Sequence, residues 1–304
     1  MSEIKLFKFS NERASEIRGE SGRLEKSLQT LIEKNLETVL GVRFVASEHS
    51  TGKVHRGRID SLGIDENDCP VILEYKRAVS ENVVSQGLYY LDWLLDHKAE
   101  FKLLVLDRYG KVVANAIDWT SPRLICVAAD FTKHDEHAVR QINRNIDLVR
   151  YRRFDGGLLA LELLTSATAD APISDEPTQK PKASKRGEDK LIAQALAEMD
   201  DQIRDLYEGL RAFILALGDD VTERPLKRYV AYRRIKNFAS VVVLKNELLV
   251  FLKVDPDSVT LEKGFSRDMR KIGHWGTGDL RLNIGSKDDL KRAEPLILRS
   301  YEGT

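Results

Sequence analysis

The sequence predicts an α/β fold, a mixed β-sheet flanked by helices, followed by a smaller α+β domain. The first observation is the order of patterned segments in the N-terminal half, which runs helix, three strands, helix, strand. The second is a pair of very apolar runs, 101–107 and 123–130, which are typical of buried strands. The third is a polar stretch that divides a chain of 304 residues, which is long enough for two cores.

The dividing stretch is residues 166–188, SATADAPISDEPTQKPKASKRGE. It contains three prolines, many small polar residues and almost no large apolar ones. Such a composition cannot bury enough apolar surface to order itself. We therefore predict a flexible linker between a first domain, residues 1–165, and a second domain, residues 189–304.

The periodicity of apolar residues and the turn signals place the elements of both domains. In the first domain we expect helices at 23–40, 80–97 and 134–145, and strands at 43–47, 57–64, 70–77, 101–107, 123–130, 146–154 and 157–164. The turn 65–69 between two of these strands makes them a hairpin. In the second domain we expect helices at 189–217 and 287–301, and strands at 228–233, 238–244, 247–254 and 280–284.

The composition limits the classes of protein that this chain can belong to. Hydrophobic residues are 42% and charged residues 32%, as in soluble globular proteins. Lys+Arg and Asp+Glu are both 48, which argues against an overall basic surface but not against a local basic groove. Two cysteines, Cys69 and Cys126, are too few for a disulfide framework and favour a reducing cytoplasm. No run of residues is apolar enough for a membrane span or a signal peptide.

Charged side chains interrupt one apolar hairpin, RIDSLGIDENDCPVILEYKR at residues 58–77. Asp60 belongs to its first strand, and Glu74 and Lys76 belong to its second. Because side chains alternate along a strand, Glu74 and Lys76 share one face, and the apolar residues between them point the other way. Burying charges without partners is costly. A divalent metal and a phosphodiester would supply the partners.

Mg²⁺ prefers oxygen ligands and keeps several waters. Asp60 and Glu74 offer two carboxylates, and the carbonyl of Tyr75 lies near the same place. The metal would acidify a water and neutralise developing charge, and Lys76 would orient that water or stabilise the transition state. A solvated strand edge with an ion pair is the alternative explanation of the same residues.

Two flanking helices carry further polar candidates. Gln86 and Tyr90 are spaced i, i+4 and share a helix face that would look toward the site, although a polar helix flank explains them as well. On the first helix, at about 100° per residue, Glu25 falls within the apolar face and Glu33 on the polar side. We therefore expect Glu25 to be a third acid facing the sheet; a glutamate reaching outward from the helix end is the alternative.

Three segments together, GRIDSLGID, VILEYKR and SQGLYYLDWL, resemble the PD-(D/E)XK nuclease superfamily over roughly residues 20–130. The segments are most similar to the RecB-type branch and to NucS-like endonucleases. The resemblance implies a restriction-endonuclease-like fold. It also implies roles for individual residues: Asp60 and Glu74 as metal ligands, Lys76 as the catalytic lysine, Gln86 and Tyr90 as the accessory helix pair, and Glu25 as the first-helix acid.

The sequence departs from the superfamily pattern in three places. Ile59 stands where a proline usually precedes the first aspartate, as in many members of the RecB-type branch. Tyr89 stands beside Tyr90, which leaves the accessory tyrosine ambiguous, and Gly87 replaces an apolar residue. None of these changes touches the metal chemistry.

Basic residues near the site are candidates for substrate binding. Arg58 and Arg77 flank the charged hairpin, and arginine pairs well with phosphates, so we expect both, with Tyr90, to contact the substrate. A second basic cluster is RYRR at residues 150–153. For each cluster a solvated face is the alternative.

The second domain contains KRYVAYRRIKNFAS at 227–240 and GHWGTGDL at 273–280. These segments resemble an uncharacterised domain family that follows predicted nucleases and also goes by the name predicted transport protein, although no membrane span supports transport. Basic residues among aromatics are typical of nucleic-acid binding, and an amphipathic strand with a buried aromatic face is the other explanation. His274 could be a ligand or base, but a structural role is favoured.

Together these features predict a cytoplasmic protein of microbial or phage type. Its function would be that of a Mg²⁺-dependent deoxyribonuclease, with Mn²⁺ as a possible substitute, acting on DNA in repair or defence. The alternative is a non-catalytic nucleic-acid-binding or protein-interaction module that keeps the nuclease fold. The sequence leaves open a homodimer, the structure of the substrate, and the choice between endo- and exonuclease.

Overall fold

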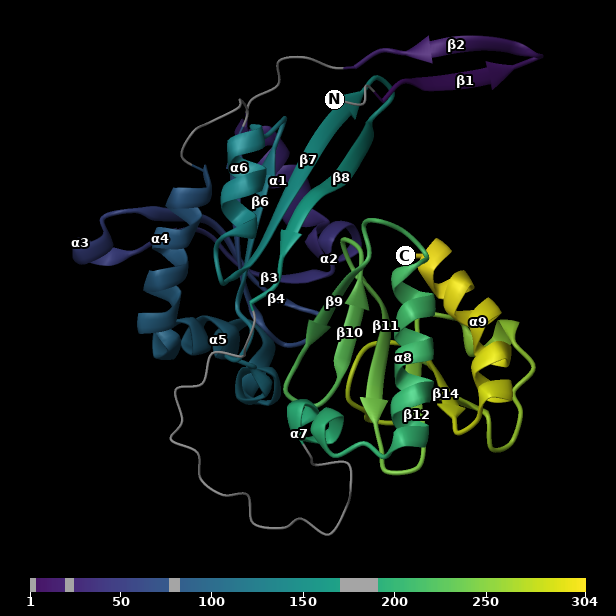
Figure 1. The fold of residues 1–304 in the computed structure, drawn as a ribbon. Helices are drawn as coiled ribbons and strands as arrows, with labels where there is room; N and C mark the ends of the chain where they lie inside the picture. The colour runs from purple at the N-terminus through teal and green to yellow at the C-terminus, as the bar shows by residue number, and fades with distance from the viewer. Residues whose placement is uncertain (1–3, 20–24, 77–82, 170–190) are drawn as a thin grey trace.

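The computed structural model describes residues 4–19, 25–76, 83–169 and 191–304. They form two six-stranded sheets and a separate two-stranded hairpin (Figure 1). The first sheet is mixed and flanked by helices, which confirms the predicted α/β class. In the described residues no helix is both long and apolar enough to cross a bilayer.

The first sheet has the strand order β3-β4-β5-β6-β7-β8. Its strands are β3 (Val42–Ser50), β4 (Arg58–Asp65), β5 (Pro70–Lys76), β6 (Arg123–Ala128), β7 (Asn145–Phe154) and β8 (Leu158–Ala167). β5, β6 and β7 are parallel, and the remaining neighbours are antiparallel. The hairpin predicted from the charged segment is therefore β4–β5. Its open end coincides with the C-terminal ends of the parallel strands.

Helices cover both faces of this sheet. The helices α4 (Val83–Asp96), α5 (Lys98–Ala116) and α6 (Lys133–Arg140) pack on the face that carries Ile72 and Leu124. The helices α1 (Glu25–Lys34) and α2 (Leu36–Leu40) pack on the face that carries Leu73 and Tyr75. The short helix α3 (Gly52–His55) lies between β3 and β4. β5 thus buries alternate residues on opposite faces, as the two-residue period predicts.

The structure overturns the strand predicted at 101–107, which lies within α5. A short apolar run has the same composition in a buried strand and in a helix, so periodicity decides. Phe101 and Val105, one turn apart, are buried, whereas Leu103 is 59% exposed. Other departures are smaller. The helix predicted at 23–40 is divided at Asn35, and the hairpin β1 (Leu6–Ser10) and β2 (Arg13–Ile17) was not predicted.

The C-terminal sheet is antiparallel throughout, with the order β13-β14-β12-β11-β10-β9. Its strands are β9 (Thr222–Pro225), β10 (Val230–Arg233), β11 (Asn237–Val243), β12 (Leu248–Leu252), β13 (Ser266–Asp268) and β14 (Leu280–Ile284). Three helices pack on one face: α7 (Ile192–Ala197), α8 (Asp201–Leu215) and α9 (Lys287–Glu302). The predicted helix 189–217 is divided because Asp200 caps α8 by accepting a hydrogen bond from the Ile203 N–H at 2.9 Å.

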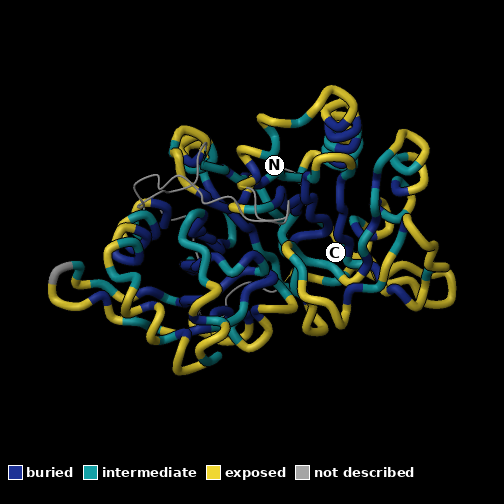
Figure 2. The backbone as a smooth tube through the Cα atoms, turned by 90° about the horizontal axis from the view of Figure 1, so that it is seen from below, coloured by how far each residue is buried: buried dark blue, intermediate teal, exposed yellow. Residues whose placement is uncertain are grey.

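The other face of the C-terminal sheet packs against the turn of the β4–β5 hairpin. Cys69, in that turn, is buried in a cluster with Leu226, Tyr229, Phe251 and other residues of the C-terminal sheet. In both halves the buried segments lie inside and the exposed segments at the periphery (Figure 2). The C-terminal domain therefore contacts the hairpin at the end away from Asp60 and Glu74.

Polar contacts hold the same turn. Asn67 Oδ1 accepts hydrogen bonds from Asn237 Nδ2 at 2.6 Å and from the Tyr229 hydroxyl at 2.9 Å. Glu66 accepts the backbone N–H of Asn237 at 2.8 Å and forms an ion pair with Lys253. We call this contact between the turn 65–69 and the C-terminal sheet the domain joint.

The linker predicted at 166–188 begins too early, because β8 continues through Ser166 and Ala167. Residues 170–188 of the predicted linker lie outside the described part.

Candidate metal-binding site

The β4–β5 ladder ends beside the charged residues. The last backbone pair is Ser61 opposite Leu73. One step further, side chains take over: the Asp60 N–H donates to Glu74 Oε1 at 3.2 Å, and the Tyr75 N–H donates to Asp60 Oδ2 at 2.9 Å. The two carboxylates therefore cross between the strands and lie in the gap where the strands separate.

The three charged residues differ in burial. Glu74 has no exposed surface, whereas Asp60 and Lys76 are partly buried. Lys76 is the last residue of β5 and lies two positions after Glu74, so both leave the strand on the face covered by α4. Glu74 and Lys76 thus share one face at the open end of the hairpin, where Asp60 lies opposite Glu74.

These donors fit a hard divalent cation. Mg²⁺ is usually held by one or two carboxylates and keeps several waters, so Asp60 and Glu74 suffice as protein ligands. In the described residues no group of three or more His, Cys, Asp and Glu could hold a metal ion; the backbone carbonyl of Tyr75 and water are further oxygen donors that such a cation accepts. Burial, and the negative charges of Glu33, Asp60 and Glu74, raise the pKa of Tyr75, which stays a neutral phenol.

The α1 helix brings two polar residues to the site that the sequence analysis did not select. Gln29 is buried, and its Nε2 donates to the backbone carbonyl of Asp60 at 2.8 Å. Glu33 Oε1 accepts hydrogen bonds from the hydroxyls of Ser61 at 2.6 Å and Ser47 at 2.7 Å. Both side chains therefore brace β4 beside Asp60. Their i, i+4 spacing was the signal available in the sequence.

The assignment of Glu33 to the polar side of the first helix is wrong. Leu31 is 40% exposed, whereas Leu28, Gln29 and Ile32 are buried, so the buried arc is centred nearer to Glu33 than the apolar residues alone predict. Glu33 lies at the edge of that arc, and its length lets it reach the sheet. Glu25 begins α1, but its side chain lies outside the described part, so its role as a third acid stays a prediction.

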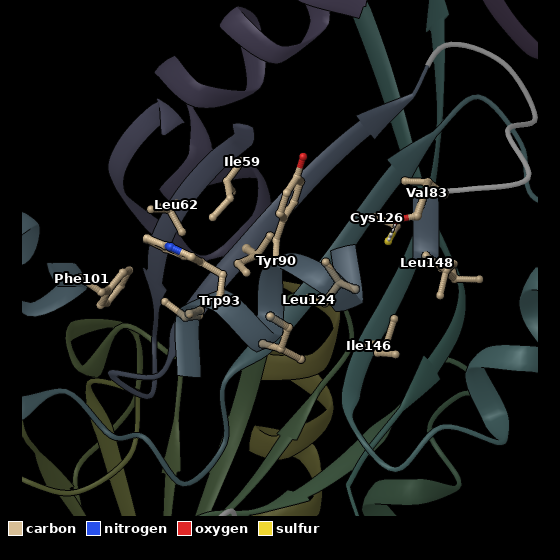
Figure 3. Packing of buried hydrophobic residues seen from close by; sticks show 14 of the residues in the cluster. Ile59, Leu62, Val83, Tyr90, Trp93, Phe101, Leu124, Cys126, Ile146 and Leu148 are labelled. Atoms are coloured by element: carbon tan, nitrogen blue, oxygen red, sulfur yellow. Dashed lines mark hydrogen bonds between the residues drawn. The ribbon is translucent and has the colours of Figure 1, made fainter. Parts of the chain in front are cut away.

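The α4 helix faces the site with Tyr90. The Tyr90 hydroxyl accepts the backbone N–H of Arg58 and the Nε2 of Gln86, each at 3.2 Å. In Figure 3 this hydroxyl points away from the apolar residues Trp93 and Leu124. Tyr89 is 47% exposed on another side of the helix, so Tyr90 is the tyrosine of this pair that contacts the start of β4.

Two glycines allow this close packing. A Cβ at Gly57 would lie 2.5 Å from the Tyr90 ring, so only glycine lets the ring approach the start of β4. A Cβ at Gly87 would lie 2.5 Å from a methyl group of Leu124 on β6. Gly87 therefore has a packing reason, because α4 crosses the sheet closely there.

Of the two arginines predicted to bind substrate, Arg58 and Arg77, the structure describes only Arg58. Arg58 is exposed at the start of β4 and pairs with Glu48 at 2.9 Å. Glu48 also binds Lys26 at 2.6 Å, and the two cations lower the pKa of Glu48 to about 2. Arg77 lies outside the described residues. Arg58 is therefore placed two residues from Asp60 with its guanidinium near the protein surface.

The motifs of the C-terminal domain are mostly structural. Tyr229, Tyr232 and Phe238 are buried, which supports the amphipathic-strand explanation of that motif. The His274 ring stacks on Phe251 at 4.6 Å, and Trp275 lies under the Arg228 guanidinium at 4.1 Å. None of these residues lies on the hairpin that carries Asp60 and Glu74.

Comparisons with known proteins give a family for the C-terminal domain and a relative of the whole chain. Residues 189–304 match the model of a family described as a domain of unknown function, DUF5655, so the C-terminal domain is a DUF5655 domain. A Haemophilus influenzae protein described as an uncharacterized protein is 29% identical over 305 residues, covering 98% of this chain and all of that protein.

Two solved structures are similar to part of the chain. One is a repair endonuclease from Pyrococcus abyssi, with 21% identity and a TM-score of 0.29; the match covers 43% of this chain and 49% of that one. The other is EndoMS in a complex with double-stranded DNA, with 17% identity and a TM-score of 0.24; the match covers 48% of this chain and 64% of that one. This chain thus spans about half the length of the Pyrococcus protein.

Proposed function

We propose that the protein is a Mg²⁺-dependent nuclease that hydrolyses phosphodiester bonds of DNA at the open end of the β4–β5 hairpin. The observation that carries the proposal is the crossing of Asp60 and Glu74 where the backbone ladder stops, with Lys76 on the same face. A hairpin that only needed stability would continue its ladder and bury apolar residues there. Two converging carboxylates instead repel each other until a cation joins them.

In the proposed reaction each residue has a defined task. Asp60 and Glu74 would hold the metal, which would supply an acidified water and positive charge beside the scissile phosphate. Lys76 leaves β5 on the same face as Glu74, and its ammonium would orient the attacking water or stabilise the negative charge of the transition state. Arg58 would contact a neighbouring phosphate, since guanidinium groups bind phosphates in two-pronged geometry.

The surrounding residues support this assignment by fixing the geometry. Gln29 holds the carbonyl of Asp60 from one face of the sheet, and Tyr90 holds the N–H of Arg58 from the other. The segment 58–60 is therefore bound on both sides, although it lies beyond the end of the ladder to β5. Preorganised ligands of this kind are what metal-assisted hydrolysis requires.

Glu74→Gln, Asp60→Asn and Lys76→Ala should each lower cleavage by about 100-fold or more, because each removes a metal ligand or a charge that stabilises the transition state. The measurement is cleavage of labelled duplex DNA, single-stranded DNA and RNA in Mg²⁺, in Mn²⁺ and in EDTA. Glu37→Gln, an exposed change on α2, is the matched control and should cut like the parent. If the three site variants cut as well as the control, the site is misassigned. DNA binding without cleavage by the parent would favour the non-catalytic alternative.

Mn²⁺ or Mg²⁺ should raise the melting temperature of the parent, because a ligand that binds only the folded state adds about 2.7 kcal/mol at 100 times its Kd. Asp60→Asn should abolish this rise. In metal-free buffer Glu74→Gln should melt at or above the parent temperature, because it removes one of two converging negative charges. Differential scanning calorimetry measures both effects. Identical melting curves of the parent in EDTA and in Mn²⁺ would contradict a metal site.

A further inference from the structure

The strands β7 and β8 extend beyond the C-terminal ends of β5 and β6, at the end of the sheet where the candidate site lies. Lys76 on β5 is level with Ala128 on β6, and Ala128 is level with Arg150 on β7. Beyond that level, residues 151–154 of β7 pair with residues 158–161 of β8. The extension therefore begins at the height of Lys76 and continues outward from the end of the sheet where the site lies.

The basic residues of this extension share the face of Lys76. Because side chains alternate along β7, Arg150 and Arg152 leave the sheet on the same side as Lys76. β7 lies two strands away from β5, which corresponds to about 10 Å. Arg150 forms ion pairs with Glu162 and, at 3.3 Å, with Asp130. Arg152 is the next basic residue outward along β7 on this face.

The N-terminal hairpin continues this path. It is attached at the tip of the β7–β8 extension, where Gly19 forms a bridge with Phe154 and the Asp155 N–H donates to the Arg18 carbonyl at 2.9 Å. Figure 1 shows β1 and β2 extending away from the rest of the molecule beyond β7 and β8. We call residues 4–18 the arm. The base of the arm is thus held at the end of the sheet where the candidate site lies, and the arm projects outward from there.

The two faces of the arm carry different kinds of side chain, aromatic on one face and basic on the other. Phe7 and Phe9, on one face, are 51% and 74% exposed. Lys8 and Arg13 lie on the other face, because their pairing partners are Ser15 and Ser10. The arm carries four basic and two acidic residues. A two-stranded hairpin without a packed face is marginally stable in water, so two exposed phenylalanines on a basic ribbon indicate a surface that gains order on a ligand.

We propose that the arm and the β7–β8 extension form a DNA-binding surface that leads away from the candidate metal site. Lys8, Arg13 and Arg152 would neutralise phosphates, and Phe7 and Phe9 would pack against sugars or bases. A two-stranded ribbon also has dimensions that the major groove accepts. The choice of DNA as ligand rests on the proposed nuclease function and on the positive charge of the arm. The surface would hold the duplex beside the cleaved bond.

The test compares two double variants in the full chain, Lys8→Ala with Arg13→Ala and Phe7→Ser with Phe9→Ser. Binding to a labelled duplex is measured in EDTA by fluorescence anisotropy between about 50 and 200 mM salt. Loss of two phosphate contacts should weaken binding about tenfold and reduce the log–log salt slope by about 2. The phenylalanine variant should weaken binding without changing the slope. Lys245→Ala with Lys271→Ala, two exposed lysines of the C-terminal domain, is the charge-matched control.

Unchanged affinity and slope in both double variants would overturn the proposal, and so would a parent that does not bind DNA. Conversion of a dimer to a monomer in the phenylalanine variant, with DNA binding intact, would show that the arm binds a second copy of the chain instead. Because binding in EDTA needs no catalysis, the test is separate from the proposed function. Arm-dependent binding by a protein that never cuts would support the surface and reject the nuclease.

Discussion

Asp147→Ala is expected to lower the free energy of unfolding by about 3–5 kcal/mol, as for other broken buried ion pairs. Asp147 on β7 has no exposed surface. Its Oδ2 accepts Arg123 Nε at 2.5 Å and lies 3.5 Å from Nη2 of Arg233, which belongs to the C-terminal sheet. Its Oδ1 accepts the Ser166 hydroxyl at 2.6 Å. One carboxylate therefore balances arginines from both sheets.

A third buried arginine, Arg224, also depends on the charge of Asp147. Arg224 on β9 is almost completely buried, and its guanidinium nitrogens have no hydrogen-bond partner in the described part of the chain. Burial lowers the pKa of Arg224, and the charge of Asp147 opposes this shift. Asp65, whose pKa burial raises, is the other acid near this cluster. Without Asp147, Arg123 and Arg233 would each lose their carboxylate partner and Arg224 one of the charges that oppose its loss of a proton, and uncompensated buried charge is costly.

Urea unfolding and the melting temperature measure the loss of stability in Asp147→Ala. Asp147→Asn should be less severe than alanine, because the amide keeps the shape and one acceptor oxygen. Asp205→Ala, an exposed aspartate in the middle of α8, is the control and should stay within about 0.5 kcal/mol of the parent. A loss below about 1 kcal/mol in Asp147→Ala would show that water, and not Asp147, compensates the arginines.

The candidate site was predictable because its signal is local. Glu74 and Lys76 are two residues apart in one strand, and a hairpin turn fixes where Asp60 stands, so a two-residue period is enough. Gln86 and Tyr90 obey the helical period in the same way. Glu33 was missed because its position depends on which leucines of α1 are buried, and Leu31 is not. That choice is made by the packing of α1 on the sheet and not by the pattern of α1 alone.

The contacts between the two domains could not be predicted from the sequence for a different reason. Arg233 stands in a motif whose basic and aromatic residues are also typical of a nucleic-acid surface, yet it is buried against Asp147, 86 positions earlier in the chain. The turn 65–69 has an ordinary hairpin composition, yet Glu66 and Asn67 bind the C-terminal sheet. Contacts between distant segments leave no periodic signal. The apolar run 101–107 failed for the related reason that only burial distinguishes its helix from a strand.

Two separate polypeptides, residues 1–180 and 181–304, should assemble into one stable complex when they are produced together. A flexible tether alone would predict that the halves separate after a cut in the linker. The joint predicts the opposite, because Cys69 is buried among residues of the C-terminal sheet and four hydrogen bonds or ion pairs reach Glu66 and Asn67. Size-exclusion chromatography and co-purification through a tag on one half measure the assembly.

The first polypeptide alone should be poorly stable, because it exposes Cys69 and leaves Asp147 with Arg123 but without Arg224 and Arg233. Glu66→Ala with Asn67→Ala should weaken the complex by at least tenfold, since each leaves buried donors of the other half unpaired. Lys245→Ala should not weaken it. Elution of two independent, stable halves would mean that the joint contributes little. Assembly would mean that the DUF5655 domain anchors the turn of the hairpin whose open end carries Asp60 and Glu74.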